Sequence, residues 1–525
     1  MTATVTPYRS TVPAGRAGLT QLIRAEWTKF RTVRGWVIAA TAGAVVMVAL
    51  GLLIANGNDS TVQTSPDSPA VPGHPYIPTG PGGEAVNDSF YLVHQTLDGD
   101  GSITTRVSAL TARRQARGTD GSIASVPADS LPTWAKAGLI IKANTGQGSV
   151  YAAIMVTAGH GVRMQYNYIH DIAGPTGTVS IASPRWLRLV RTGQTIDGYA
   201  SLNGSSWTRV GTVRLPGLPR SVPAGMFAAT PSQSAVLAQG LASSSVGSGA
   251  VVATATLDKP DLEGAWSTPG WTGTAIHSAT DNTAGSGFQQ TDTMYTVTGS
   301  GDIGPYVDTG GTPGQLLTGG FAALIVLTVL GVVFVTTEYR RGLIRTSLLL
   351  SPRRGRVLAA KAVVLGAVAF VTALLAAAIT VPVGEHLEAA KGSFVEPISA
   401  LTEARVIVGT AALLAVAAVL ALAVGTMLRR GAAAVAVVIV LVALPNLLGI
   451  AGVLPTGASQ WVLRLMPAAA LAVQQTVPAY AQVDQTYSPM HGFYPLSPWV
   501  GFAVLCVWTA LALAAAGYLL RRRDA

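Results

Sequence analysis

The sequence contains little charge. Only 11% of its 525 residues are Asp, Glu, Lys or Arg, whereas 49% are hydrophobic, and a water-soluble domain usually has about a quarter of its residues charged. The single cysteine, Cys506, excludes an internal disulfide framework and a cysteine-based metal site. The seven histidines have no ligand spacing. We therefore predict a membrane protein with no metal site and no cofactor bound to this chain.

Common catalytic motifs are also absent from the sequence. It has no Gly-Lys-Ser or Gly-Lys-Thr, and therefore no P-loop that could hold a nucleotide phosphate. It also lacks a G-x-S-x-G elbow and an H-E-x-x-H helix. The stretches GDGS and GTDG are typical of turns rather than of calcium loops. We predict that this chain is not an enzyme and contains no catalytic residue.

The sequence contains several long apolar runs. A helix needs about 20 apolar residues to cross roughly 30 Å of hydrocarbon. The first run is too long for a signal-peptide core and lacks a cleavage site after it, so we predict an uncleaved anchor. Six windows meet the length, and we predict six transmembrane helices: 36–55, 317–337, 357–381, 404–427, 432–454 and 498–520.

The net charge of +10 is distributed unevenly. Segments 1–35, 338–356, 428–431 and 521–525 together hold 17 Lys or Arg and 3 Asp or Glu, so the remaining chain is acidic overall. With six spans these four segments fall on one side of the membrane, which is the positive-inside pattern. We therefore predict a plasma-membrane protein with both termini cytoplasmic and residues 56–316 extracellular. Nucleic acid is not expected as a partner, because the basicity is a signal of topology.

The region between the first two spans has a different composition. A Pro/Gly/Ser-rich linker is followed by short alternating stretches, with Asn203-Gly204 as a tight-turn dipeptide. This pattern predicts an all-β antiparallel sandwich, and the last strands either close it or form a small appended unit. The predicted organisation is thus N-terminal segment 1–35, span 36–55, linker 57–88, sandwich 89–245, strand-rich extension 246–315, span 317–337, cytoplasmic segment 338–356 and the four remaining spans in 357–525.

Two cytoplasmic segments are amphipathic. Apolar residues recur at spacings of three and four from Leu19 to Val33, which predicts a basic helix lying in the membrane interface. A second short helix should start near Glu338, and Ser351-Pro352 should begin the next membrane helix, with Lys361 snorkelling toward the surface. The first helix, called the elbow helix below, contains Arg24, Glu26, Trp27, Lys29, Phe30 and Arg31.

Aromatic residues on the predicted strands have two interpretations. A sugar can stack on an exposed aromatic ring, and an extracellular glycan would then be a ligand of the sandwich. Aromatic residues also supply much of the buried area of a β-sandwich, and half of these candidates must pack its core. The candidates are Tyr166, Tyr168, Trp186, Tyr199 and Trp207.

The stretches LIRAEWTKFRTVRGW and TTEYRRGLIRTSLLLSPRRGRVLAAK, which precede the first and third spans, resemble actinobacterial permeases of type-2 ABC exporters. The resemblance covers the membrane part. It implies that the second stretch contains a coupling helix docking on a separate ABC-type ATPase, which would bind ATP and Mg²⁺. The residues implied at that contact are Glu338, Tyr339, Arg340, Arg341, Leu343 and Arg345.

The stretches WAKAGLIIKA and YAAIMVTAGHGVRMQY resemble a concanavalin A-like, jelly-roll-type sandwich, inserted here in the first outer loop. Together the two resemblances imply a transporter permease that pairs with a second copy or a sibling permease in the bilayer. A membrane-anchored protein that binds or senses a glycan or the cell wall is the alternative. A glycoside hydrolase is a third possibility, but no paired carboxylate site can be identified for it.

Overall fold

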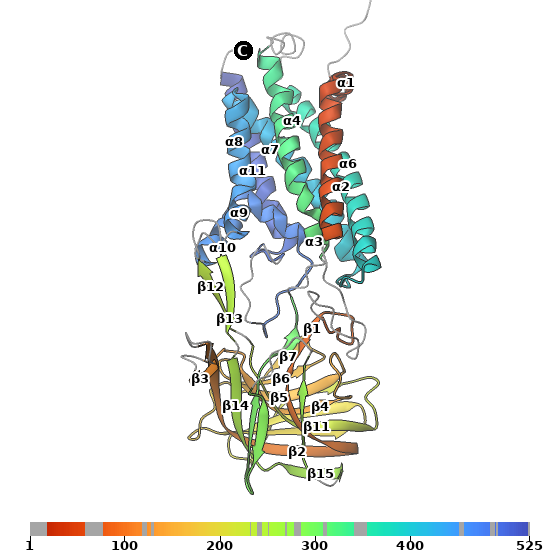
Figure 1. The fold of residues 1–525 in the computed structure, drawn as a ribbon. Helices are drawn as coiled ribbons and strands as arrows, with labels where there is room; N and C mark the ends of the chain where they lie inside the picture. The colour runs from red at the N-terminus through yellow and green to blue at the C-terminus, as the bar shows by residue number, and fades with distance from the viewer. Residues whose placement is uncertain are drawn as a thin grey trace, which may run out of the picture.

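The computed structural model describes the chain in two parts, a helical bundle and a β-sheet region at one end of it (Figure 1). The described residues are 18–57, 77–117, 123–127, 131–231, 233–238, 244–249, 251–267, 270–277, 285–307, 312–340, 354–450, 456–483, 489 and 492–522.

Five helices of the bundle are long and apolar enough to cross a membrane, which makes the chain a multi-pass membrane protein. The second of these spans starts with the short helices α3 (Pro313–Leu316) and η1 (Leu317–Gly319). Helix α7 is the most enclosed, and it packs against α4, α6 and α11. The long helices are α2 (Arg34–Gly57), α4 (Gly320–Arg340), α6 (Arg354–Ala390), α7 (Ala400–Leu428) and α11 (Pro498–Arg522).

The predicted span at 432–454 is divided into two shorter helices, α8 (Gly431–Val442) and α9 (Leu444–Ile450). Pro445 has no N–H to donate to the preceding turn and therefore interrupts the helix there. Hydrogen bonds continue across the break, since Ala443 N donates to Ile439 O and Leu447 N donates to Ala443 O. The two helices consequently follow one another along the bundle (Figure 1).

Two further short helices lie between α9 and α11, at the end of the bundle that faces the sheets (Figure 1). Helix α10 (Thr456–Leu465) exposes Trp461 and Leu465, whereas every residue of the 3-10 helix η2 (Pro467–Gln474) is buried. Helix η2 packs against α11 and α7, and Gly501 allows this contact because a Cβ there would lie 2.2 Å from Ala469 O.

The β region is a large antiparallel sheet structure of sandwich or barrel-like form. Its strands are β1 (Val86–Asp88), β2 (Phe90–Arg117), β3 (Ile123–Pro127), β4 (Lys136–Lys142), β5 (Tyr151–Thr157), β6 (Val162–Tyr166), β7 (His170–Ala173), β8 (Arg185–Thr192), β9 (Thr195–Ser201), β10 (Thr208–Arg214), β11 (Ser221–Ala229), β12 (Gln233–Ala238), β13 (Ser244–Gly249), β14 (Val251–Asp258), β15 (Asp261–Trp266), β16 (Thr272–Ile276), β17 (Gly287–Gln290), β18 (Met294–Gly299) and β19 (Ile303–Pro305).

The long strand β2 organises this region. It pairs with β8 and β11 of the main path β10-β9-β8-β2-β11-β4-β5-β6-β7 and also with β3, β14, β15 and β16. Strands β5–β6 and β9–β10 form two hairpins, the second around Asn203-Gly204. Strand β6 ends at Tyr166, because Asn167 and Tyr168 have φ values of 44° and 64°.

The strand-rich extension belongs to the same sheet. Strand β14 pairs with β2 on one side and β18 on the other, and its Ala255 and Leu257 lie in the same buried cluster as residues of β4, β5 and β8. Of the two open alternatives, closure of the same sandwich is therefore the one observed. Strands β12 and β13 form a separate two-stranded ribbon that extends toward α10 (Figure 1).

Packing and hydrogen bonds connect the β region to the bundle. Strand β1 pairs with β19, the last strand before the second membrane helix. Phe394, which follows α6, is buried against Ile77 and Ala85 at the start of the β region. Gln482 donates a hydrogen bond of 3.1 Å from Nε2 to Tyr168 O. The sheets are thus held by segments that precede and follow several membrane helices.

Candidate functional site

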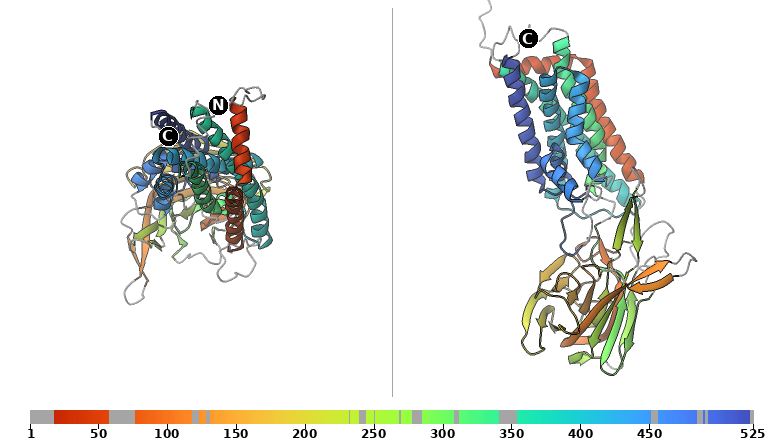
Figure 2. Two further views of the ribbon diagram at one scale, coloured as in Figure 1. Left: turned by 90° about the horizontal axis from the view of Figure 1, so that it is seen from above. Right: turned by 90° about the vertical axis from the view of Figure 1, so that its left-hand side faces the viewer.

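The elbow helix is present as α1 (Leu19–Thr32), which lies across the end of the bundle far from the β region (Figures 1 and 2). Phe30 is 4% exposed, and its ring centroid lies 6.1 Å from that of Trp36 and 6.0 Å from that of Phe334. Trp27 stacks on Phe30 from outside and is 47% exposed. Aromatic packing therefore fixes α1 to the start of α2 and to α4.

Arg24 and Arg31 are exposed on α1, as a helix in a membrane interface requires. Glu26 is different, because it is only 4% exposed although it belongs to the same helix. It follows Leu22 and Ile23 by one turn and precedes Phe30 by one turn, so it lies on the apolar face. A carboxylate in this position needs a buried partner.

That partner is Lys361 of α6, which is 2% exposed. Its Nζ lies 2.8 Å from Glu26 Oε2 and 2.6 Å from Glu338 Oε1, and Glu338 belongs to α4. Lys29 completes the cluster, with its Nζ 2.9 Å from Glu26 Oε1 and 3.3 Å from Glu338 Oε1. We call these four residues the ion-pair quartet: Glu26, Lys29, Glu338 and Lys361.

The quartet is electrically balanced, since two ammonium groups face two carboxylates. Lys361 Nζ also lies 4.8 Å from the ring centroid of Phe334, which adds a cation–π interaction. Burial by itself lowers the pKa of Lys29, but the Glu26 and Glu338 carboxylates outweigh it and raise the pKa above its ordinary value. Among the described residues, Glu338 Oε2 has no hydrogen-bond partner.

The quartet joins the two helix ends that flank residues 341–353. Glu338 lies in the last turn of α4, and Lys361 lies in the second turn of α6. The expected snorkelling of Lys361 is wrong, because its ammonium group is held inside by two carboxylates and does not reach the surface. The quartet thus links α1, α4 and α6 at the two ends of this segment.

The other residues expected at the ATPase contact are only partly described. Tyr339 is half-buried, and the Arg429 guanidinium lies 4.9 Å from its ring centroid. The pair is a local contact between α4 and the turn after α7. Arg340 ends α4. The positions Arg341, Leu343 and Arg345 lie outside the described residues.

The quartet was not predicted from the sequence, although the position of Glu26 contained a signal for it. A carboxylate on the apolar face of a helix predicts a cation on a neighbouring element. Lys361 was the counterpart, a lysine more than one turn inside a predicted span. No periodicity links residues 335 positions apart, so the pairing required the tertiary structure.

The candidate glycan residues separate into three groups in the structure. Tyr168 is fully buried, and its hydroxyl donates to Asp88 Oδ2 at 2.6 Å, so its ring cannot stack on a sugar. Tyr166 is half-buried and stacks on His170 at the end of β6. Trp186 and Tyr199 are half-buried on the outward side of the neighbouring strands β8 and β9, and Trp207 immediately precedes β10.

A second buried polar cluster surrounds Tyr168. Lys142 Nζ lies 2.7 Å from Asp88 Oδ2, and both side chains are fully buried. Burial lowers the pKa of Lys142, although Asp88 opposes this, and burial raises the pKa of Tyr168 well above its ordinary value. The cluster fixes β1 to β4 and to the turn after β6, next to the Gln482 contact with the bundle. We assign it a structural role.

Among the described residues, no group of three or more His, Cys, Asp or Glu side chains could hold a metal ion. Several of the described carboxylates form ion pairs, such as Glu26 with Lys361 and Asp88 with Lys142.

Comparisons with solved structures give weak similarities only. One is a functionally unknown protein from Saccharomyces cerevisiae, with 12% identity and a TM-score of 0.18 over 35% of this chain and 72% of that chain. Scytalido-glutamic peptidase with a transition state analog inhibitor has 8% identity and a TM-score of 0.25 over 41% of this chain and 98% of the peptidase. These values support no functional conclusion. No curated protein matches the chain.

A protein-family model identifies the family of this chain. The model described as ABC-2 family transporter protein matches residues 223–525, which is more than half of the chain and includes α4, the quartet residues Glu338 and Lys361, and all later helices. This chain belongs to the ABC-2 transporter family.

Proposed function

We propose that the chain is the membrane subunit of an ABC exporter, driven by a separate ATPase subunit and paired with a second copy or a sibling permease. Family membership supports an ABC transporter membrane subunit. We take α8 and α9 together as the fifth of six membrane crossings. With six crossings, the basic segments face the cytoplasm and the β region lies outside, in agreement with their opposite positions on the bundle (Figure 1).

The observation that carries the proposal is the ion-pair quartet. Residues 341–353 connect Glu338 to Lys361, and both residues are tied to Glu26 of α1 or to its neighbour Lys29. An ATPase that presses on this segment through Arg341 and Arg345 would therefore move three helices as one unit. ATP and Mg²⁺ would be bound by the ATPase, because this chain contains no P-loop.

Rocking of the helices would move a lipid-like or amphipathic cargo toward the outer face. The β region would receive the cargo there or control its exit. Strand β19 is the last strand before the second membrane helix, and this supports such a role because the connection would carry movement of that helix to β19 and its partner β1.

The test uses the double variant Arg341→Glu/Arg345→Glu in the full chain, purified from its native membrane in mild detergent. We expect a stoichiometric ATP-binding subunit to accompany the wild type and to be lost from the variant, because reversed charges repel a complementary surface. Arg430→Glu is the matched control, since Arg430 is exposed at the same end but lies outside the segment. Retention of the ATPase by the double variant would contradict the docking site.

A second function, glycan recognition, rests on one observation in the β region. Trp186 and Tyr199 share the outward side of adjacent strands, with Trp207 at the start of the next. We propose that these three rings form a stacking platform for an extracellular glycan. Binding of the full chain to a glycan array should then be lost in Trp186→Ala, whereas Tyr166→Ala should retain it. Equal loss in both variants would contradict this platform.

A further inference from the structure

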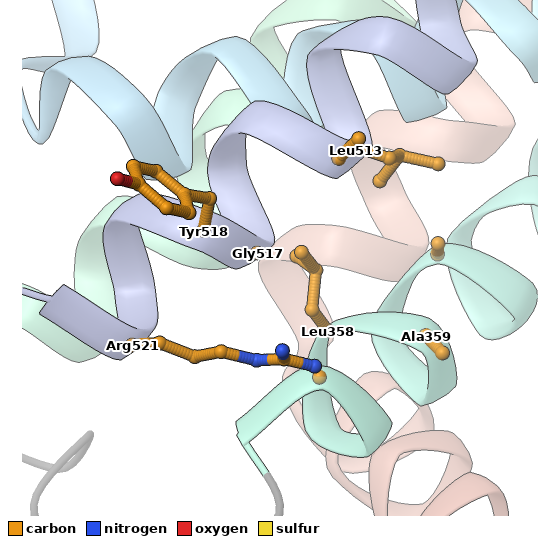
Figure 3. Close-up of a pocket in the computed structure, with 9 residues that line it drawn as sticks. Leu358, Ala359, Leu513, Gly517, Tyr518 and Arg521 are labelled. Carbon is orange, nitrogen blue, oxygen red and sulfur yellow. The ribbon is translucent and has the colours of Figure 1, made fainter.

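A cavity of about 400 Å³ lies between α6 and α11, toward the end of the bundle where α1 is found (Figures 1 and 3). Its volume falls within the range of about 300–1,000 Å³ that is typical of ligand pockets. Apart from the two residues at its outer end, its lining is apolar. It is lined by Gly355, Leu358, Ala359, Ala362, Leu513, Ala514, Gly517, Tyr518 and Arg521.

The groove exists because small residues face each other across it. A Cβ built at Gly517 would meet no atom within 4 Å, so the backbone of α11 leaves open space at that point. Ala359 and Ala514 are exposed, which means that described parts of the chain do not cover the groove. Leu358 and Leu513 supply its walls (Figure 3). A membrane helix pair with such a gap exposes it to lipid chains.

A cation lies at the mouth of the groove. Arg521 extends from α11 toward the first turn of α6 (Figure 3), where its Nη2 would be 3.7 Å from a Cβ at Gly355. No described residue forms an ion pair with Arg521. By contrast, Arg354 donates from Nη1 to Leu520 O at 2.6 Å and thereby connects the two helices beside the mouth. Within the described part of the chain, the Arg521 guanidinium is therefore available for an anion.

The depth of the mouth fits a lipid headgroup. Helix α1, whose exposed arginines and Trp27 are typical of an interfacial helix, crosses this same end of the bundle (Figure 2). Tyr518 is 54% exposed and lies 4.8 Å from the Arg522 guanidinium, an arrangement common where aromatic rings meet the headgroups. An apolar slot with a cation at headgroup depth matches a phospholipid with its chain inward and its phosphate outward.

We propose that this groove binds one anionic phospholipid, with an acyl chain between Leu358 and Leu513 and its phosphate against Arg521. Charge complementarity favours this occupant over a second copy of the chain, because two copies would bring like-charged arginines together. Arg521 is the specificity-determining residue, and the small residues Gly517 and Ala514 make room for the chain. The inference does not depend on the ATPase partner or on the direction of transport.

The test is native mass spectrometry of the full chain in mild detergent, titrated with phosphatidylglycerol or with phosphatidylcholine of identical acyl chains. The wild type should bind phosphatidylglycerol at least about fivefold more tightly, the factor given by one cation near an anionic lipid surface. Arg521→Gln should remove this preference. Gly517→Phe should weaken the binding of both lipids, because its ring fills the open space.

Two matched control variants carry the same type of substitution at positions outside the groove. Arg430→Gln removes an exposed arginine at the same end, and Ala515→Phe adds a ring at an exposed position of α11 that does not line the cavity. Both should bind lipid as the wild type does. Arg521→Lys should retain the preference for phosphatidylglycerol. If Gly517→Phe fails to fold, Ala514→Leu replaces it, because leucine adds a smaller volume to the groove.

Several results would overturn the proposal. Equal binding of the two lipids by the wild type, or an equal loss of preference in Arg430→Gln, would mean that Arg521 does not select the headgroup. Unchanged lipid binding when Gly517 or Ala514 is enlarged would place the acyl chain elsewhere. Conversion of a wild-type dimer to monomers by Gly517→Phe, seen in the same spectra, would show that a second copy occupies the groove.

Discussion

Replacement of Lys361 by methionine tests whether the ion-pair quartet holds the three helices together. Methionine keeps the length and apolar contacts of the lysine stem but removes the ammonium group. Glu26 and Glu338, with side-chain exposures of only 5% and 7%, would then keep only the partly exposed Lys29 as a cation. The free energy of unfolding should fall sharply, because two buried carboxylates would lose their buried partner and share one partly exposed ammonium group.

The size of the effect follows from the geometry. At the observed distances of 2.8 and 2.6 Å, Coulomb's law with an effective dielectric constant of about 20 gives an attraction of roughly 6 kcal/mol per pair. Desolvation of the buried ions offsets a large part of this attraction. Removal of one partner from a buried pair costs about 3–5 kcal/mol in practice, and we expect that value for Lys361→Met.

Lys29→Met is the matched control, because Lys29 binds the same two carboxylates through the same type of contact. Its side chain is 39% exposed, against 3% for Lys361. Water screens a pair of this kind, so its loss should cost only about 0–1 kcal/mol. The assay is unfolding of the full chain in mixed micelles with increasing SDS, followed by circular dichroism of the helices.

A third variant separates lost pairing from lost packing. Glu26→Gln/Glu338→Gln/Lys361→Met removes the whole set of buried charges that Lys361 neutralises, and should recover most of the stability lost in Lys361→Met. Similar losses of stability in Lys361→Met and Lys29→Met would refute the reasoning, since burial would then not decide the strength of these ion pairs. So would a failure of the triple variant to recover any stability.

Two further predictions concern other parts of the chain. Gly331→Ala should destabilise the bundle by about 1–3 kcal/mol in the same SDS unfolding assay, because its Cβ would lie 2.5 Å from Ala418 O and overpacking displaces neighbouring backbone. Gly320→Ala on the same helix is the control and should not destabilise the bundle, because a Cβ there has nothing within 4 Å. Burial lowers the pKa of His94 below its ordinary value of 6.5, so the unfolded chain binds the proton more readily. The β region should therefore lose stability as pH falls below 6.5 toward the folded pKa, and limited proteolysis of the full chain on either side of pH 6.5 should show this for the wild type and not for His94→Gln.

The sequence alone determined the membrane class, the elbow helix and the β region. Apolar runs that are long relative to the bilayer have few alternatives to a spanning helix, which is why five of the predicted spans appear as long helices. Alternation with period two was sufficient for the β9–β10 hairpin, although its connection is a loop of residues 202–207 around Asn203-Gly204 and not the predicted tight turn. Only the window around Pro445 appears as two shorter helices.

The tertiary structure decided which distant residues meet. Glu26 and Lys361 are 335 positions apart, and only the packing of α1 against α6 brings their charges to 2.8 Å. Tyr168 could not be assigned to surface or core from alternation, because its positive φ follows from the turn after β6 and its burial from Asp88 on another strand. Local patterns report the preferences of neighbouring residues, whereas a buried ion pair depends on the position of whole elements, and the chain fixes that position only when it folds.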